Sequence, residues 1–242
     1  MKSTMNYRFT FSKLSDDLKS VLDHGYKILT CSQFIDAKKS GELPMLTLVL
    51  RVDIDVSVKK AARLGEIFKD QGINGTFFLR LHANEYNPFA FENYRIIKQL
   101  IQEGNEIGYH SEIIDQAEIW NETPDDCLMR DIAVMELVFG IKIRGVASHG
   151  GMTGLNNLDF WVTRKPSDFG LDYEAYDKEN AFNLFHNSRY ISDSEWTKWK
   201  AYENGALIHD DRRSFREHLS DKCPLIYLLL HPETFFDRHF YE

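Results

Sequence analysis

Two aspartates with a single residue between them stand at the end of an apolar run. The segment 48–55 (LVLRVDID) is typical of a buried strand, and the side chains of a strand alternate between its two faces. Asp53 and Asp55 are therefore expected on one face, where two carboxylates repel each other unless a cation or a shared proton lies between them. Burying such a pair destabilises the fold, which a purely structural role does not explain. The spacing thus favours a functional site over the alternative in which Asp53 caps a helix or pairs with Arg51.

Histidines follow apolar segments at three further places. His110, His149 and His231 each come at or just after the end of a segment with the pattern of a strand. Carboxylate and imidazole groups together suit zinc or a similar divalent ion, which acidifies water and polarises an acyl oxygen. These residue types predict hydrolysis, with base and acid roles open to the second carboxylate and a remaining histidine. For His149, which precedes two glycines, a place in a turn is the alternative.

The first half of the chain alternates between strand and helix patterns, and the second half is less regular. Strands are expected at residues 45–55, 76–79, 107–110 and 143–148, with one-faced apolar helices between them. Further strands are expected at 160–164, 171–176, 189–192, 206–209 and 225–230, and a helix at 215–219. Parallel strands joined by helical crossovers bring their C-terminal ends to one mouth, where ligands bind. The aspartates and the three histidines are predicted to meet there.

Three of these segments resemble the motifs of the polysaccharide deacetylases, the family-4 carbohydrate esterases. The segments are 51–55 (RVDID), 106–111 (EIGYHS) and 229–231 (LLH). The resemblance implies that Asp53 is the catalytic base and that Asp55 and His110 bind a metal ion. It also implies that His231 is the catalytic acid.

A weaker similarity concerns the segment 193–196 (DSEW), in which Asp193 would support the acid and Trp196 would line the sugar site. Two further segments, 75–78 (GTFF) and 86–89 (YNPF), are similar to a divergent branch found among envelope and O-antigen sugar biosynthesis enzymes. The resemblance covers residues 45–235 and implies an α/β fold, a distorted (β/α) barrel with about seven parallel strands. We therefore expect a single domain over residues 1–242, with residues 1–44 as an N-terminal helical extension of the barrel.

The chain departs from the family pattern at two positions. The second motif of the family has another metal-binding histidine four residues after the first, and this chain has Ile114 there. The third ligand is then His149 or Glu112. His149 is favoured because neighbouring parallel strands lie about 4.8 Å apart and because its ring replaces the lost imidazole in kind. The family also places an arginine beside the base, where this chain has a valine, and Arg51 or Arg144 is expected to take that role.

The composition limits the partners and the compartment. The 242 residues carry a formal net charge of −8 and no cluster of Lys and Arg interleaved with aromatics, which argues against nucleic acid as a partner. No run of about 18 apolar residues is present, so no transmembrane segment is expected, and the protein is predicted to be cytoplasmic. The three cysteines share no close spacing and suggest neither a disulfide framework nor a thiolate metal site. The oligomeric state is left open.

The sequence thus predicts a metal-dependent hydrolase, with zinc as the expected ion and a carbohydrate as its substrate. It would remove an acetyl or other acyl group from the nitrogen of an N-acylated sugar or glycoconjugate, in cell-surface polysaccharide biosynthesis. One alternative is hydrolysis of another non-peptide amide. The other is a non-catalytic barrel that has lost its metal and acts in binding or assembly, as the replacement at Ile114 would suggest.

Overall fold

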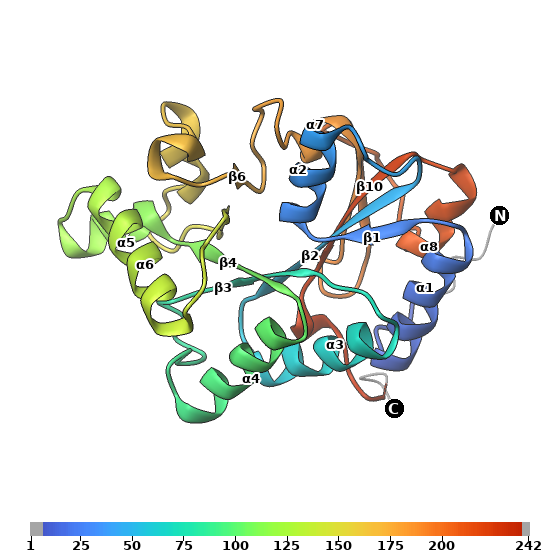
Figure 1. The fold of residues 1–242 in the computed structure, drawn as a ribbon, viewed down its shortest axis with the longest axis horizontal. Coiled ribbons are helices and arrows are strands. Elements are labelled where there is room, and N and C mark those ends of the chain that lie inside the picture. Colours follow the sequence, from blue (N-terminus) through green and yellow to red (C-terminus); the bar gives the residue numbers. More distant parts are fainter. Residues whose placement is uncertain (1–6, 239–242) are drawn as a thin grey trace.

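Strand β2 (Thr47–Ile54) lies at the centre of the molecule, and all eight of its residues are buried. A computed structural model describes residues 7–238, which form a mixed α/β fold around one ten-stranded sheet (Figure 1). The strands run in the order β6-β5-β4-β3-β2-β10-β7-β8-β9, and β1 pairs additionally with β2. The series from β6 to β7 contains seven strands with parallel pairings only, whereas β8 and β9 are added antiparallel. The predicted α/β class with a mostly parallel sheet is therefore confirmed.

The remaining strands are short, and the connections carry helices of very different length. The other strands are β1 (Lys27–Leu29), β3 (Thr76–Leu79), β4 (Glu106–Ser111), β5 (Gly145–Ser148), β6 (Tyr173–Glu174), β7 (Arg189–Ser192), β8 (Lys200–Glu203), β9 (Ala206–Leu207) and β10 (Leu225–Leu230). The α-helices are α1 (Phe11–Asp23), α2 (Cys31–Ser40), α3 (Val58–Asp70), α4 (Phe91–Gln102), α5 (Ile113–Trp120), α6 (Pro124–Phe139), α7 (Leu184–Asn187) and α8 (Phe215–His218). Four 3-10 helices complete the description, at η1 (Asn157–Val162), η2 (Pro166–Phe169), η3 (Leu219–Asp221) and η4 (Pro232–Thr234).

The N-terminal segment contributes more than the helical extension expected from its sequence. Thr10 caps α1 by accepting a hydrogen bond from the backbone of Lys13, and Thr30 begins α2 with a capping box. Between these helices, β1 pairs in parallel with the first three residues of β2. The segment before residue 45 is therefore joined to the sheet by a strand as well as by helix packing.

The second half of the chain shows where periodicity alone misleads. The strands expected at 189–192 and 225–230 are confirmed as β7 and β10, and the helix expected at 215–219 is α8. The strand expected at 160–164 is wrong, because residues 160–162 belong to η1 and residues 163–164 lie in no strand. The side chain of Asn156 caps this helix by accepting from the backbone of Leu158, and the ring of Phe160 packs edge-on against Trp161. Local capping and aromatic packing therefore outweigh strand propensity here.

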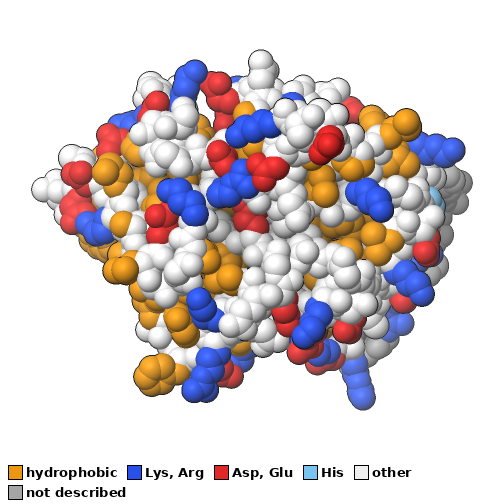
Figure 2. Space-filling model, viewed as in Figure 1, with side chains coloured by type: hydrophobic (Ala, Val, Ile, Leu, Met, Phe, Trp, Pro, Cys, Tyr) orange, Lys and Arg blue, Asp and Glu red, His pale blue; other side chains and the backbone are white. Residues whose placement is uncertain are grey.

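On the face of the molecule drawn in Figure 2, basic and acidic side chains are interspersed rather than gathered into fields of one sign. Within residues 7–238, no helix combines the length and the apolar character needed to cross a membrane.

Candidate active site

The register of the parallel strands brings the predicted site residues to one level. Ile54 of β2 pairs with Leu79 of β3, which pairs in turn with Tyr109 of β4. The residues that follow them, Asp55 and His110 among them, therefore lie side by side at the C-terminal ends of these strands.

The register of β10 with β2 places His231 at the same level. Leu230 of β10 pairs with Val52 of β2, so His231, which follows Leu230, comes level with Asp53. Four strand ends thus supply polar side chains to a single mouth, as the sequence pattern predicts.

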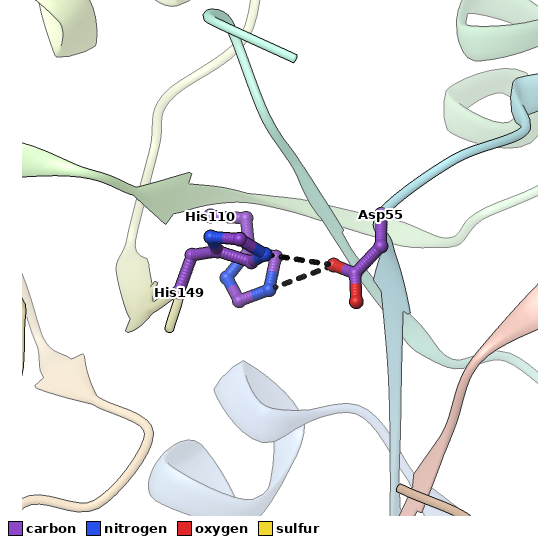
Figure 3. Close-up of side chains that lie close together, drawn as sticks. All are labelled: Asp55, His110 and His149. Atoms are coloured by element: carbon purple, nitrogen blue, oxygen red, sulfur yellow. Dashed lines mark ion pairs between the residues drawn. The ribbon is translucent and has the colours of Figure 1, made fainter. Parts of the chain in front are cut away.

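Asp55, His110 and His149 form a group with the geometry of a metal site. One ligand atom from each lies within 4.8 Å of the other two, and the three side chains point toward one another (Figure 3). His110 Nε2 lies 3.2 Å from Asp55 Oδ1, and His149 Nε2 lies 3.8 Å from the same oxygen. One carboxylate oxygen and two imidazole nitrogens are a donor set found in catalytic zinc sites, which keep a further position open.

Two observations show that these residues fit a cation. His110 Nδ1 lies 2.8 Å from the carbonyl oxygen of Ala147 and can only donate to it, so the lone pair of the neutral ring is on Nε2, which faces Asp55. Asp55 Oδ1 is shielded from solvent and accepts no hydrogen bond of good geometry. A buried carboxylate oxygen and a lone pair aimed at the same point need a positive charge between them.

The same carboxylates favour the protonated form of His110. Burial lowers the pKa of His110, but Asp53 and Asp55 outweigh it and raise the pKa above its ordinary value. Burial raises the pKa of Asp55, yet the adjacent ring of His110 and the other nearby histidines bring it well below the usual range.

Glu112 lies behind His149 rather than among the ligand atoms. Its carboxylate accepts a hydrogen bond from Arg80 at 2.7 Å and lies 3.4 Å from His149 Nδ1. Burial raises the pKa of Glu112, but His149 and Arg80 together hold it below its ordinary value. Arg80 also donates to the backbone oxygen of Asp55 at 2.9 Å. Glu112 therefore lies where a carboxylate could orient the ring of His149 from outside the group of ligand atoms.

Asp53 is held by Arg51 on its own strand. Arg51 donates two parallel hydrogen bonds to the carboxylate, from Nε to Oδ1 at 2.8 Å and from Nη2 to Oδ2 at 2.6 Å. Burial raises the pKa of Asp53, but Arg51, His110 and His231 outweigh it, so the pKa stays below its usual range. Arg144, the other candidate for this role, pairs instead with Asp36 and Asp172 far from the base. The structure therefore places Arg51 beside the expected base.

His231 is held by Asp193 in the same manner. Asp193 follows β7, and its carboxylate accepts hydrogen bonds from His231 Nδ1 at 2.6 Å and from the His231 backbone at 2.9 Å. Burial lowers the pKa of His231, but Asp193, with Asp53 and Asp55, raises it to about 9. The ring is therefore protonated at neutral pH, with Nε2 facing the site 3.8 Å from Asp55 Oδ2. Trp196 lies over this ring with its centroid 6.3 Å away and is half exposed.

A cavity of about 410 Å³ opens over these side chains. Five aromatic side chains line this cavity as an aromatic wall, and the sequence predicts only one of them, Trp196. The other four are Tyr176, Phe185, Tyr190 and Tyr202. Tyr190 and Tyr202 are opposite each other across the antiparallel pair β7–β8, but β8 has no clear sequence signal. The guanidinium of Arg51 lies 4.8 Å from the centre of the Tyr176 ring, which ties this wall to the base.

Comparison with known proteins found similar solved structures only. No protein-family model matches the chain, and no curated protein matches it. The chain is similar to the structure of IcaB from Ammonifex degensii, with a TM-score of 0.49 and 17% identity over 68% of this chain and 74% of that one. It is similar to the BpsB deacetylase domain from Bordetella bronchiseptica, with a TM-score of 0.45 and 15% identity over 72% of this chain and 79% of that one. A third neighbour is the wild-type CE4-family pseudoenzyme from Bacillus anthracis, with a TM-score of 0.46 and 17% identity over 78% of this chain and 55% of that one.

Of these neighbours, the protein from Bacillus anthracis is described as a CE4-family pseudoenzyme and the domain from Bordetella bronchiseptica as a deacetylase. The three TM-scores lie below 0.5 and the three identities do not exceed 17%, so the chemistry of the site is judged from this chain's own side chains.

Proposed function

We propose that this protein is a metal-dependent hydrolase that removes an acetyl group from the nitrogen of an N-acetylated sugar. The observation that carries the proposal is the convergence of a candidate metal group, Asp55, His110 and His149, with a clamped carboxylate and a clamped histidine on either side. A divalent ion held by the three side chains would acidify water and polarise the acyl oxygen. Zinc is the ion that best suits one carboxylate and two imidazoles.

Asp53 is the base in this proposal. Its two hydrogen bonds from Arg51 keep it ionised at neutral pH and fix the direction of its free lone pairs toward the cavity. An ionised carboxylate in that position can take the proton of the attacking water.

His231 is the acid. Its raised pKa keeps a proton on Nε2 at neutral pH, and the hydrogen bond from Nδ1–H to Asp193 fixes the ring orientation. The base is therefore ionised and the acid protonated over the same pH range, which is the pairing that amide hydrolysis requires. His231 would give its proton to the departing nitrogen.

The substrate proposed here is an N-acetylated glycan, such as those of cell surfaces, because the walls around the site suit sugar rings. The aromatic side chains of the catalytic cavity can pack against the C–H faces of a sugar. A second cavity of about 770 Å³ shares Tyr176 and Phe185 with the first. Three basic and three acidic side chains line it, so their formal charges cancel and favour neutral sugar units over a diphosphate group.

The test is a comparison of Asp53→Asn with Asp55→Asn. We expect Asp53→Asn to keep its zinc and to lose most acetate release from N-acetylated oligosaccharides, and Asp55→Asn to lose the zinc as well. Elemental analysis and an acetate assay measure the two properties separately. Asp36→Asn, which changes an exposed carboxylate far from the site, is the control and should alter neither. Failure of the wild-type protein to bind zinc after reconstitution at neutral pH would instead favour a non-catalytic barrel.

A further inference from the structure

A buried aspartate at the start of α5 holds the loop that carries His149. Asp115 is only 2% exposed, and its carboxylate accepts hydrogen bonds from four donor groups of the loop after β5. Oδ1 accepts from the backbone of Thr153 at 2.8 Å and from its hydroxyl at 2.7 Å. Oδ2 accepts from the backbone of Met152 at 2.9 Å and from Asn157 Nδ2 at 2.7 Å. One side chain therefore accepts from two backbone nitrogens and one hydroxyl of this loop and from the amide of Asn157 at its end.

Asn157 links the start of α5 to the backbone of His149. Its Oδ1 accepts from the backbone nitrogens of Ile114 and Asp115 at 2.9 and 3.0 Å, which are free donors of the first turn of α5. Its Nδ2 donates to the backbone oxygen of His149 at 3.2 Å as well as to Asp115. Asn157 is 1% exposed, so these bonds lie away from competing water. The start of α5 is thus tied to the residue that supplies the third candidate ligand.

Apart from these bonds, the start of the loop is anchored by a hydrogen bond from the backbone of His149 to the carbonyl oxygen of Ser111 at 2.9 Å. Met152 and Leu155 are 55% and 48% exposed, so apolar burial contributes little to its order. The loop also folds tightly, since a Cβ atom added at Gly151 would lie 1.6 Å from the carbonyl oxygen of Leu155. A tight, exposed turn of this kind depends on hydrogen bonds from its backbone to a buried acceptor.

We propose that Asp115 and Asn157 are positioning residues that fix His149 for metal binding. The proposal rests on the proposed function, because it takes His149 as a ligand. The neighbouring position, Ile114, lacks the histidine that α5 would otherwise bring to the metal. In this chain α5 acts on the site through Asp115 instead, which orders the loop bearing the replacement imidazole.

The experiment measures zinc affinity and loop order in Asp115→Asn and in Asn157→Ala. An asparagine at 115 turns one acceptor oxygen into a donor that faces the donors of the loop. We expect zinc affinity, measured by competition with a chromophoric chelator, to fall about 10- to 100-fold in each variant, as is usual for residues that orient ligands. In the metal-free protein, hydrogen exchange of backbone amides between residues 149 and 157 should become at least about 10-fold faster.

Asp17→Asn is the matched control. Asp17 is also a buried aspartate, accepts a hydrogen bond from Tyr7 and pairs with Arg216, but it lies on α1, across the molecule from α5 (Figure 1). It should lower stability without changing zinc affinity or exchange in the loop. A purely structural role for Asp115 predicts the same pattern as this control, and that result would overturn the proposal.

Gly151→Ala provides a second route to the same question. It distorts the loop without touching Asp115, so it should weaken zinc binding to a similar degree. Unchanged hydrogen exchange of the loop in both Asp115→Asn and Asn157→Ala would refute the positioning role of these residues, even if the wild-type protein bound zinc tightly. If the wild-type protein bound no zinc but hydrogen exchange of the loop were faster in the variants, the proposed function would be refuted, while Asp115 and Asn157 would still be shown to order the loop.

Discussion

Replacing Asp193 by asparagine should move the alkaline limit of activity to lower pH. Asp193 is the strongest of the groups that raise the pKa of His231, and burial alone lowers that pKa. The substitution keeps an oxygen that can accept from the backbone of His231, but it removes the negative charge next to Nδ1. The protonated ring is therefore stabilised less, and the pKa of His231 falls.

The size of the effect follows from the two pKa values. With a pKa of about 9, about three quarters of the His231 population is still protonated at pH 8.5. If the pKa falls to the ordinary value of about 6.5, only about 1% is protonated at that pH. At pH 6 the two populations differ by less than about 1.5-fold. The ratio of wild-type to variant kcat/KM should therefore grow roughly 50-fold between pH 6 and pH 8.5.

The assay is the pH profile of acetate release under kcat/KM conditions. The two proteins are compared by how their kcat/KM changes with pH. A loss of kcat/KM caused by a less well oriented His231 ring is the same at every pH and therefore cancels. Ser194→Ala, a change at the next residue that leaves the charge intact, serves as the control. An alkaline limb at the same pH in Asp193→Asn and wild type would show that His231 is not the titrating acid.

Three further results are expected. Arg51→Lys cannot donate two parallel hydrogen bonds, so the pKa of Asp53 should rise, and a pH profile should show the acid limb of activity at higher pH; an unmoved acid limb would contradict the pairing. His149→Ala should weaken zinc binding about 10-fold or more in chelator competition, and equal affinity would shift the ligand assignment to Glu112. His231→Ala should lower turnover about 10²- to 10⁴-fold with normal zinc content by elemental analysis, and near-normal turnover would remove His231 from the mechanism.

The strand ends could be predicted from the sequence because each is marked by an apolar run that stops at a polar residue. Asp55 and His231 directly follow β2 and β10, and His110 is the last residue but one of β4. The choice between the two arginines could not be made in this way. Alternation places Arg51 on the face of Asp53, but only the folded chain shows that Arg144 has its partners elsewhere.

The direction of the Glu112 side chain could not be predicted from the sequence either. A continuing strand would put Glu112 on the same face as His110, but β4 ends at Ser111 and Glu112 precedes the first residue of α5. Its backbone turns away from the extended conformation, and its carboxylate meets His149 from behind. Strand ends shift by a residue or two for tertiary reasons, so a side chain just past the end has no face that the sequence can specify. The aromatic wall was missed for a related reason, since β8 is four residues long and is defined by its pairing with β7.

Asp53 takes its counter-ion from its own strand. Arg51 and Asp53 are separated by one residue of β2, so a few backbone dihedral angles fix their relative position. Sliding of β10 against β2, or of β4 against β3, changes the distance from the base to His231 or His110, but it leaves the ion pair intact. An arginine supplied by a neighbouring strand would lose its alignment in the same motion. The alignment of the Arg51–Asp53 pair is therefore set within β2 itself, and small shifts of the strands beside β2 leave it in place.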